Sequence, residues 1–503
     1  MKFRFDYVRV AAVIALLVLA GCSLGPAYHR PALDIPKQFR GTPATQAAAW
    51  PTGDWWRGFN SPDLNRLIDL ARVQNFDIAA AIARVHQADA QVRIAGAPLL
   101  PTLDASAGAS WSQVGLNSRS FSGSGGTSTR TIDEHNYNLG LNASYQVDFW
   151  GQIRAARQAA VASDVFSRFD QQTVALTVVT DVAQTWFTAL GFADRLAVAQ
   201  QNLAASQQTL AVIRGRLDAG TATALDLAQQ QALVDGERAN IPAFRNQLES
   251  ELNGLGILVG EPPERITVRP GTLTALSLPA VGPGLPSQLL ARRPDVASAE
   301  AQLLAANFDI RSARAAFFPT IQLTGQRGFA NAALGSLFEP GGIVASAAVS
   351  ALQPVIDGGL LRGQLEQAKG RYAELVADYR KAVVQAFTDV EAALIAWRYT
   401  TEQEAAAQQA VDTARRAADI ARAQLEAGTV DVTTLLTTEE TLFSDEDALV
   451  QVRLSRVLAL LDLYKALGGG WVQPAGPMLD QFPGLSPGLL PGAISLPVGG
   501  NVE

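Results

Sequence analysis

Two long stretches of this 503-residue chain contain no proline, and this absence limits its possible folds more than any other feature. One lies between Pro101 and Pro242, the other between Pro354 and Pro474. Because proline breaks a helix interior, only stretches like these can hold very long helices. We expect helices over residues 151–218 and 359–426, each about 100 Å long at ~1.5 Å per residue.

Apolar residues recur at steps of three and four within both expected helices. Examples are Val179, Val182 and Trp186 in the first, and Val383 and Phe387 in the second. This is coiled-coil spacing, and it places the residues on one stripe. Each long helix is therefore expected to pack against a partner helix.

The tripeptide Ala-Gly-Thr follows each long helix, at 219–221 and 427–429. Glycine in that position can adopt the left-handed conformation that ends a helix. A second helical segment follows each tripeptide. The pattern predicts two antiparallel coiled-coil hairpins, residues 151–258 and 359–467.

Four stretches outside these helices have a period of two. Residues 102–112 and 136–149 alternate between apolar and polar side chains without a break. Residues 320–329 alternate less cleanly because Arg327 falls on the apolar side, and 343–353 is the weakest of the four. Such alternation predicts strands with one apolar face, and the lengths suit tilted membrane strands of ~9–11 residues. Soluble hairpins packed on a core are the alternative.

If these strands cross a membrane, the protein must be an oligomer. Every backbone amide in lipid needs a partner, so a membrane sheet cannot keep open edges. Four strands are too few to close, since bacterial barrels start at about eight. Two chains would supply eight strands and three would supply twelve.

The N-terminus has the features of a secretory signal. An apolar run over residues 10–21 follows Lys2, Arg4 and Arg9, and it is too short for a spanning helix of roughly 20 residues. The next residue is Cys22, the only cysteine of the chain. Residues 19–22 (LAGC) resemble a bacterial lipobox, which implies cleavage before Cys22 and attachment of S-diacylglycerol and N-acyl lipid to it.

An internal repeat organises the rest of the chain. Residues 99–102 recur as 317–320, and 217–221 recur as 425–429, with the expected elements in the same order. The expected regions are a lipoprotein signal peptide (1–21), a lipidated linker (22–54), a first repeat (55–260), a linker (261–284), a second repeat (285–471) and a Pro/Gly-rich tail (472–503).

Composition excludes several classes of function. The chain has 40 Lys and Arg residues and 47 Asp and Glu residues, a net charge of −7. It therefore has no excess of basic residues with which to bind nucleic acid. One Cys and three His cannot form a Cys/His zinc cluster. No nucleophile, base and metal stand together, so we expect no enzyme activity, catalytic residue, metal or cofactor beyond the covalent lipid.

Several segments together resemble the outer membrane factor family, the TolC-like channels of tripartite efflux pumps, and within it the NodT-type lipoproteins. They are 25–31 (GPAYHRP), 55–56 (WW), 148–151 (DFWG), 289–296 (LLARRPDV), 313–319 (ARAAFFP) and 464–471 (YKALGGGW). The resemblance implies a mainly α fold with β: a homotrimer whose chains give four strands each to a 12-stranded β-barrel, continued by a long α-helical barrel. It also implies the outer membrane of a Gram-negative bacterium.

The expected function is a passive exit duct for drugs or toxic compounds, from the periplasm to the exterior. By the same resemblance, a periplasmic adaptor protein links the duct to an inner membrane transporter of the resistance-nodulation-division (RND) type. One alternative is the outer membrane duct of a type I protein-secretion system. Another is a lipid-anchored periplasmic coiled-coil scaffold.

The resemblance also assigns roles near the hairpin turns. The family's tip pattern Arg-Leu-x-x-Gly matches 216–220, whereas 424–428 lacks the Arg. The expected adaptor-docking residues are Arg216, Leu217, Gly220, Thr221, Gln424, Leu425, Gly428 and Thr429. Related channels carry constricting aspartates where this chain has Thr434 and Thr437. The candidates for a pore constriction here are Asp226, Asp431, Thr434 and Thr437.

Overall fold

The computed structural model describes residues 28–36, 38–40, 50–118, 128–266, 271–282, 284 and 286–473. The expected signal peptide, Cys22 and nearly all of the expected C-terminal tail lie outside these residues. The described residues divide into two compact units: those within Met1–Arg30, Gln87–Asp164 and Ala301–Val376 form the first, and those within Pro31–His86, Val165–Glu300 and Ala377–Glu503 the second. Across the described part of the chain, no helix combines the length and apolarity needed to span a membrane.

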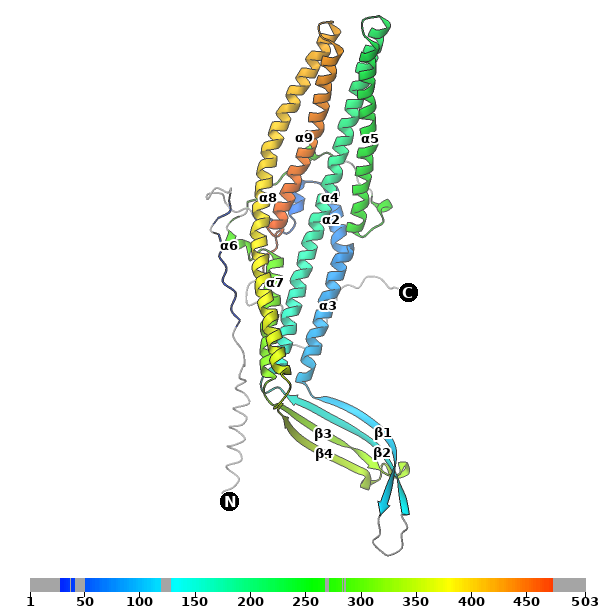
Figure 1. Ribbon diagram of the computed structural model, residues 1–503, viewed down its shortest axis with the longest axis vertical. Helices are drawn as coiled ribbons and strands as arrows, with labels where there is room; N and C mark the ends of the chain where they lie inside the picture. The colour runs from blue at the N-terminus through cyan, green and yellow to red at the C-terminus, as the bar shows by residue number, and fades with distance from the viewer. Residues whose placement is uncertain are drawn as a thin grey trace. The chain divides into compact units, whose positions relative to one another are not determined.

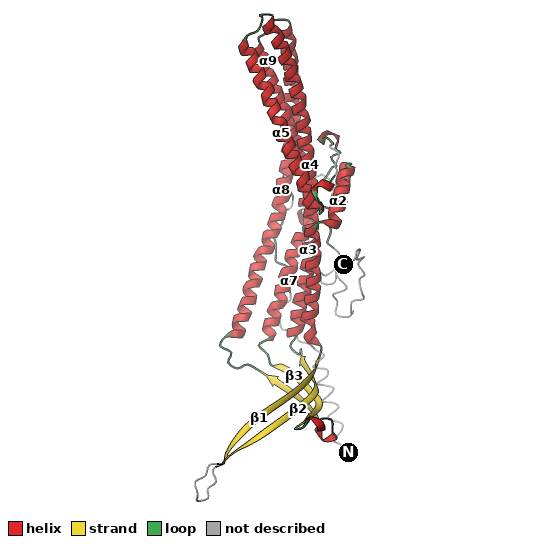
Figure 2. Cartoon of the chain, turned by 90° about the vertical axis from the view of Figure 1, so that its right-hand side faces the viewer, coloured by secondary structure: helices red, strands yellow, loops and turns green. Residues whose placement is uncertain are grey.

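Two long helical hairpins and a four-stranded sheet dominate the fold, as the sequence predicts (Figures 1 and 2). The first hairpin consists of α4 (Gln152–Asp218) and α5 (Ala224–Val259). The second consists of α8 (Leu360–Glu426) and α9 (Val432–Ala466). Helices α4 and α8 have 67 residues each, so the absence of proline does mark two very long helices.

The first unit contains an antiparallel sheet with strand order β1-β2-β3-β4. The strands are β1 (Thr102–Ser118), β2 (Ser128–Val147), β3 (Thr320–Asn331) and β4 (Ile343–Leu352). Within the described residues, β1 and β4 each pair with one neighbour and so leave one edge unpaired. Every residue of β4 is exposed.

Strands β1 and β2 have different ends from those predicted. β1 continues past 112 to Ser118, while β2 begins at Ser128 instead of 136 and ends at Val147 instead of 149. Their pairing continues as far as Ser118 opposite Ser128. Residues 115–133 are rich in Ser, Thr and Gly, a composition typical of loops, but backbone pairing between adjacent strands does not require apolar side chains. β3 likewise continues two residues beyond 329.

Residues 148–151 form the junction between β2 and α4, and two of their side chains stabilise it. The carboxylate of Asp148 accepts hydrogen bonds from the backbone amides of Ile153 and Arg154, both at 2.9 Å. The Trp150 indole donates to the carbonyl of Pro319 at 2.9 Å. Asp148 therefore caps the first turn of α4, and Trp150 holds the junction against the segment that leads into β3.

Shorter helices connect these elements. They are α2 (Pro62–Gln74), α3 (Phe76–Gly96), α6 (Pro286–Leu289) and α7 (Pro294–Ala315), with the 3₁₀ helices η1 (Trp55–Phe59), η2 (Ala97–Leu99), η3 (Pro263–Arg265), η4 (Leu273–Ala275), η5 (Leu334–Ser336) and η6 (Pro340–Gly342). The main apolar core lies in the second unit, where η1, α2, α4, α5 and α9 meet. Trp55 stacks on Tyr464 there, with ring centroids 4.7 Å apart.

Candidate functional site

The end of α4 is a glycine-dependent helix cap. Gly220 has a φ of +74°, and its amide donates to the carbonyl of Leu217 at 2.9 Å. The amide and hydroxyl of Thr221 donate to the carbonyl of Arg216, at 2.8 and 3.1 Å. These bonds define a Schellman motif, whose positive φ favours glycine.

The end of α8 has the same geometry. Gly428 also has a φ of +74°, and its amide donates to the carbonyl of Leu425 at 2.9 Å. The amide and hydroxyl of Thr429 donate to the carbonyl of Gln424, at 2.9 and 3.1 Å. The pattern expected to bind an adaptor is therefore, in both repeats, also the set of residues that ends the long helix.

The return helix of the first hairpin begins with a capping box. Asp226 donates its backbone amide to the Thr223 hydroxyl at 3.1 Å, and its carboxylate accepts from the Thr223 amide at 2.8 Å. The Thr223 hydroxyl also lies 2.9 Å from the same carboxylate oxygen. The side chain of Asp226 thus stabilises the start of α5.

The return helix of the second hairpin is capped by Asp431. Its carboxylate accepts from the backbone amide of Thr434 at 2.8 Å and from the Thr434 hydroxyl at 2.6 Å. These hydrogen bonds, the one from the hydroxyl first, lower the pKa of Asp431 below its usual value. Asp431 therefore stays ionised under mildly acidic conditions.

The four candidate constriction residues lie at the starts of the two return helices. Asp431, Thr434 and Thr437 are exposed at the start of α9, whereas Asp226 is half-buried at the start of α5. Thr437 donates its hydroxyl to the carbonyl of Thr433 at 2.9 Å. Both acids already cap a helix, so their position alone does not require a role in a pore.

The two tips pack against each other through an apolar cluster. Ile213 of α4, Leu425 of α8 and Leu435 of α9 are at most 3% exposed and belong to this cluster. Arg216 also reaches the second tip, since its Nη2 atom lies 3.9 Å from the position that a Cβ atom on Gly428 would take. Arg216 and Gly428, one predicted docking residue from each repeat, are therefore neighbours, whereas Leu425 is buried in the cluster.

A buried acid near the tips was not selected from the sequence. Glu439 of α9 is 0% exposed. Its Oε1 accepts from the Thr209 hydroxyl of α4 at 2.8 Å and from the Arg422 guanidinium of α8 at 3.0 Å. Its Oε2 has no partner among the described residues. Glu439 thus links three helices of the two hairpins.

The spacing of apolar residues could have located Glu439. Val432, Leu435, Glu439 and Leu442 follow one another at steps of three and four, so Glu439 occupies a position of the buried stripe. Its neighbour Glu440 is exposed. The two adjacent glutamates therefore lie on different faces of α9.

Arg293, within the segment 289–296, connects three parts of the second unit. Its guanidinium donates to Asp295 at 2.6 and 3.0 Å, to Asp389 of α8 at 2.8 Å and to the carbonyl of Ala466 at 3.3 Å. Although burial opposes the charge, the bonds to Asp295 and then Asp389 leave the pKa of Arg293 above its usual value. Arg293 fixes the C-terminal end of α9 against α8.

The glycine run of the segment 464–471 is also structural. Gly468, Gly469 and Gly470 all have positive φ angles, of 83°, 57° and 84°. A Cβ atom on Gly468 would lie 1.8 Å from the carbonyl oxygen of Arg292. Glycine is required there by both the conformation and the lack of space. No group of three or more His, Cys, Asp or Glu residues in the described ranges is arranged to hold a metal ion.

Comparison with known proteins agrees with this architecture. The family model described as outer membrane efflux protein matches residues 67–261 and 285–469, one stretch in each repeat. The chain is 38% identical over 463 residues to the pyoverdine export outer membrane protein OpmQ of Pseudomonas aeruginosa, covering 92% of this chain and 97% of OpmQ. It is 31% identical over 460 residues to the cation efflux system protein CusC of Escherichia coli K12, covering 90% of this chain and 97% of CusC.

A solved structure has the same fold. The crystal structure of a membrane protein from Pseudomonas aeruginosa superposes with a TM-score of 0.80 at 31% sequence identity. The match covers 89% of this chain and 100% of that chain. The sheet and the two long hairpins are thus parts of a fold that occurs in a related membrane protein.

Proposed function

This chain belongs to the outer membrane efflux protein family, and we propose that it acts as a passive exit duct for small molecules such as drugs or toxic compounds. It is an outer membrane channel component of a tripartite efflux system, located in the outer membrane of a Gram-negative bacterium. The observation that carries the proposal is a four-stranded sheet with two unpaired edges in the same chain as two very long hairpins. A duct of this kind conducts its substrates and does not convert them.

Three copies of the chain assemble around one axis in this proposal. The unpaired edge of β1 in one copy pairs with β4 of the next, which closes a 12-stranded barrel and leaves no open edge in lipid. Exposed apolar residues on α8 support contacts between copies in the helical part as well. Val384, Ile395 and Ile420 are 63%, 49% and 57% exposed in the single chain.

The hairpin tips are the proposed docking surface for a periplasmic adaptor protein. Through it the duct serves an inner membrane transporter of the RND type. The surface comprises Arg216, Leu217, Gly220, Thr221, Gln424, Gly428 and Thr429, while the eighth predicted docking residue, Leu425, is buried beneath it. The exposed Leu225 beside the first tip, at 66%, adds apolar area that a partner could cover. Arg216→Glu should reduce the amount of adaptor that co-purifies, while Arg245→Glu, on an exposed part of α5, should not.

A ring of Asp431 side chains is the proposed constriction. The Asp431 carboxylate is exposed, and its lowered pKa keeps it charged. In the proposed trimer, three such carboxylates surround the axis. Asp226 is the second candidate, and Thr434 and Thr437 line the turn beyond Asp431. Asp431→Ala should lower cation selectivity in planar bilayers more than Asp226→Ala does. Unchanged conductance and selectivity in both variants would exclude the ring.

A lipid anchor on Cys22 is proposed from the lipobox-like residues before it. Mass spectrometry of the mature protein should find an N-terminal Cys22 that carries diacylglycerol and an N-acyl chain. A mature N-terminus elsewhere, or an unmodified Cys22, would exclude the anchor. In Cys22→Ser the protein should still need detergent, because the barrel remains in the membrane.

Native mass spectrometry and channel recording together test the duct. Detergent-solubilised protein should give the mass of three chains, and the same sample should produce stable channels in planar bilayers. A single-chain mass with no conductance would reject the proposal.

A further inference from the structure

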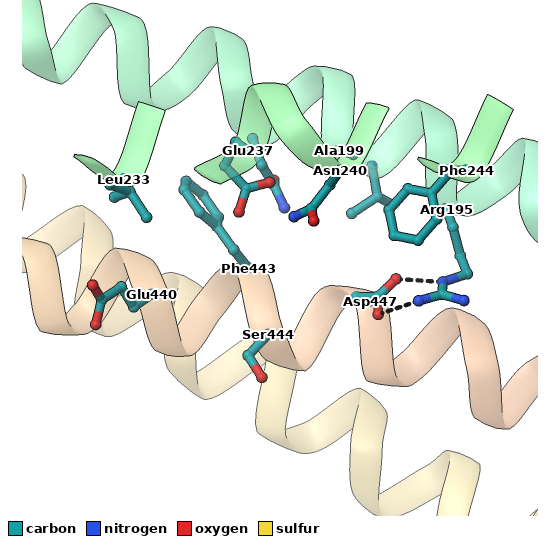
Figure 3. A pocket seen from close by; sticks show the side chains of 12 residues that line it. Arg195, Ala199, Leu233, Glu237, Asn240, Phe244, Glu440, Phe443, Ser444 and Asp447 are labelled. Atoms are coloured by element: carbon teal, nitrogen blue, oxygen red, sulfur yellow. Dashed lines mark hydrogen bonds and ion pairs between the residues drawn. The ribbon is translucent and has the colours of Figure 1, made fainter. Parts of the chain in front are cut away.

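A cavity of about 380 Å³ lies between α4, α5 and α9 (Figure 3). Its lining includes Arg195 and Asn202 of α4, Glu237 and Phe244 of α5, and Phe443 of α9. Figure 3 shows Glu237 and Phe443 pointing into the gap between α5 and α9. The cavity thus joins the first hairpin to the second and presents both charged and aromatic groups.

One end of the cavity is electrically neutral. The guanidinium of Arg195 donates to both carboxylate oxygens of Asp447, at 2.6 and 2.9 Å (Figure 3). It also lies 4.3 Å from the ring centroid of Phe244. Arg195 and Asp447 therefore neutralise each other, and the Phe244 ring already has a cation over it.

The remaining charge of the lining is negative. Glu237 and Glu440 take part in no ion pair among the described residues. Burial raises the pKa of Glu237, while a hydrogen bond from Asn240 partly opposes this effect. A positive charge placed beside Glu237 would stabilise its ionised form.

An amide side chain also lines the cavity. Asn202 is only 5% exposed, and its side chain makes no hydrogen bond to any part of the chain that the structure describes. Its amide atoms are not among the buried polar atoms that lack a partner, so they are open to the cavity. A ligand inside the cavity therefore has a free amide oxygen within its reach.

We propose that this cavity binds a small organic ammonium ion with an apolar body. The ammonium group lies between Glu237 and Glu440 and donates to the amide oxygen of Asn202, while the apolar body packs on the Phe443 ring. Because Glu237 belongs to α5 and Glu440 to α9, the bound cation connects the two hairpins. This site is separate from the proposed adaptor surface and constriction.

Isothermal titration of the detergent-solubilised full-length protein with 4-phenylbutylamine tests the site. The uncharged 4-phenyl-1-butanol serves as the matched neutral probe. We expect the amine to bind at least tenfold more tightly than the alcohol, since a hydrogen bond to a charged group is stronger than one to a neutral group. Glu237→Gln should remove this difference, and Phe443→Leu should weaken both probes.

Glu249→Gln is the control, because Glu249 is exposed on the same helix and does not line the cavity. Glu440→Gln, at an exposed position, replaces Glu237→Gln if the latter lowers the thermal stability of the protein. Equal binding of amine and alcohol to the unaltered protein would overturn the proposal. So would an equal loss of amine binding in Glu249→Gln and Glu237→Gln, which would indicate general attraction to an acidic protein.

Discussion

Helices α5 and α9 are the return helices of the two repeats, yet they are buried to very different degrees. Buried residues of α9 recur from Val432 to Ala466 along nearly its whole length. Helix α5 buries residues mainly near its two ends, such as Val234 and Leu255, and Ile257 is 75% exposed. The same helical-hairpin arrangement therefore has a buried return helix in one repeat and a largely exposed return helix in the other.

The difference shows which properties the two repeats share. The turns at Gly220 and Gly428 agree in φ and in their hydrogen bonds, because a turn is fixed by local backbone geometry. Burial is fixed by what packs against the helix, and that differs between the repeats. Similar turn sequences thus predict similar geometry but not similar surroundings.

The largest contrast should come from apolar truncations in the two return helices. Leu460→Ala in α9, where Leu460 is 1% exposed, should cost ~2–5 kcal/mol of stability. Ile257→Ala in α5 should cost about 0.5 kcal/mol or less, as for other exposed positions. Unfolding in detergent followed by circular dichroism measures both. A large loss for Ile257→Ala would mean that the assembled protein covers this face of α5.

Replacing a buried polar residue should likewise cost more stability in α9 than in α5. Glu439→Ala leaves the Thr209 hydroxyl without its acceptor and should cost ~1–3 kcal/mol. Gln230→Ala on α5 removes one hydrogen bond to the Ser206 carbonyl and should cost ~0.5–1.5 kcal/mol. Glu and Gln side chains have nearly the same volume, and both are 0% exposed here, so the two truncations remove a similar buried volume. If Gln230→Ala proved the more destabilising, Glu439 would not be a main link between the hairpins.

The two tip glycines should respond alike. Gly220→Ala and Gly428→Ala each force alanine into a φ of +74° and should cost about 1 kcal/mol. Thermal unfolding of both single variants measures this. Gly215→Ala in the interior of α4, where nothing lies near the new Cβ, should instead be neutral or slightly stabilising. Unequal losses at 220 and 428 would show that the tips differ in more than their surroundings.

The smallest effect concerns pH at the second tip. The pKa of Asp431 is lower in the folded protein than its ordinary value of 3.8, so the stability that its ionised carboxylate adds is fully present above pH 3.8. That stability is lost as the pH falls through the lower pKa of the folded protein. The difference in Tm between the unaltered protein and Asp431→Asn should therefore shrink between pH 5 and pH 2.5. A constant difference would mean that the carboxylate charge does not stabilise the cap.

The long helices and strands could be predicted because their signals lie within single segments. The absence of proline before Pro242 and the period-two alternation of residues 136–149 need no knowledge of neighbours. The extra residues of β1 and β2 could not be predicted in this way. Residues 113–118 lie beyond the unbroken alternation, and they become part of a strand because β2 pairs with them.

The contacts of buried charged residues were harder to predict from the sequence, because their partners are distant along the chain. The caps at Thr223 and Asp431 follow from local sequence, whereas the contacts of Glu439 involve Thr209, 230 residues away. Arg293 similarly meets Asp389 and Ala466 only after folding. A charged residue on an apolar stripe is the one local sign that such a distant partner exists.

Hydrogen exchange of the sheet tests the central claim, a barrel closed between copies, most directly. In the detergent-solubilised assembly, the outward amides of edge strands β1 and β4 should be protected as strongly as those of β2 and β3, since each edge pairs with a neighbouring copy. Fast exchange confined to the outward amides of β1 and β4 would contradict the account, because it would leave the sheet open.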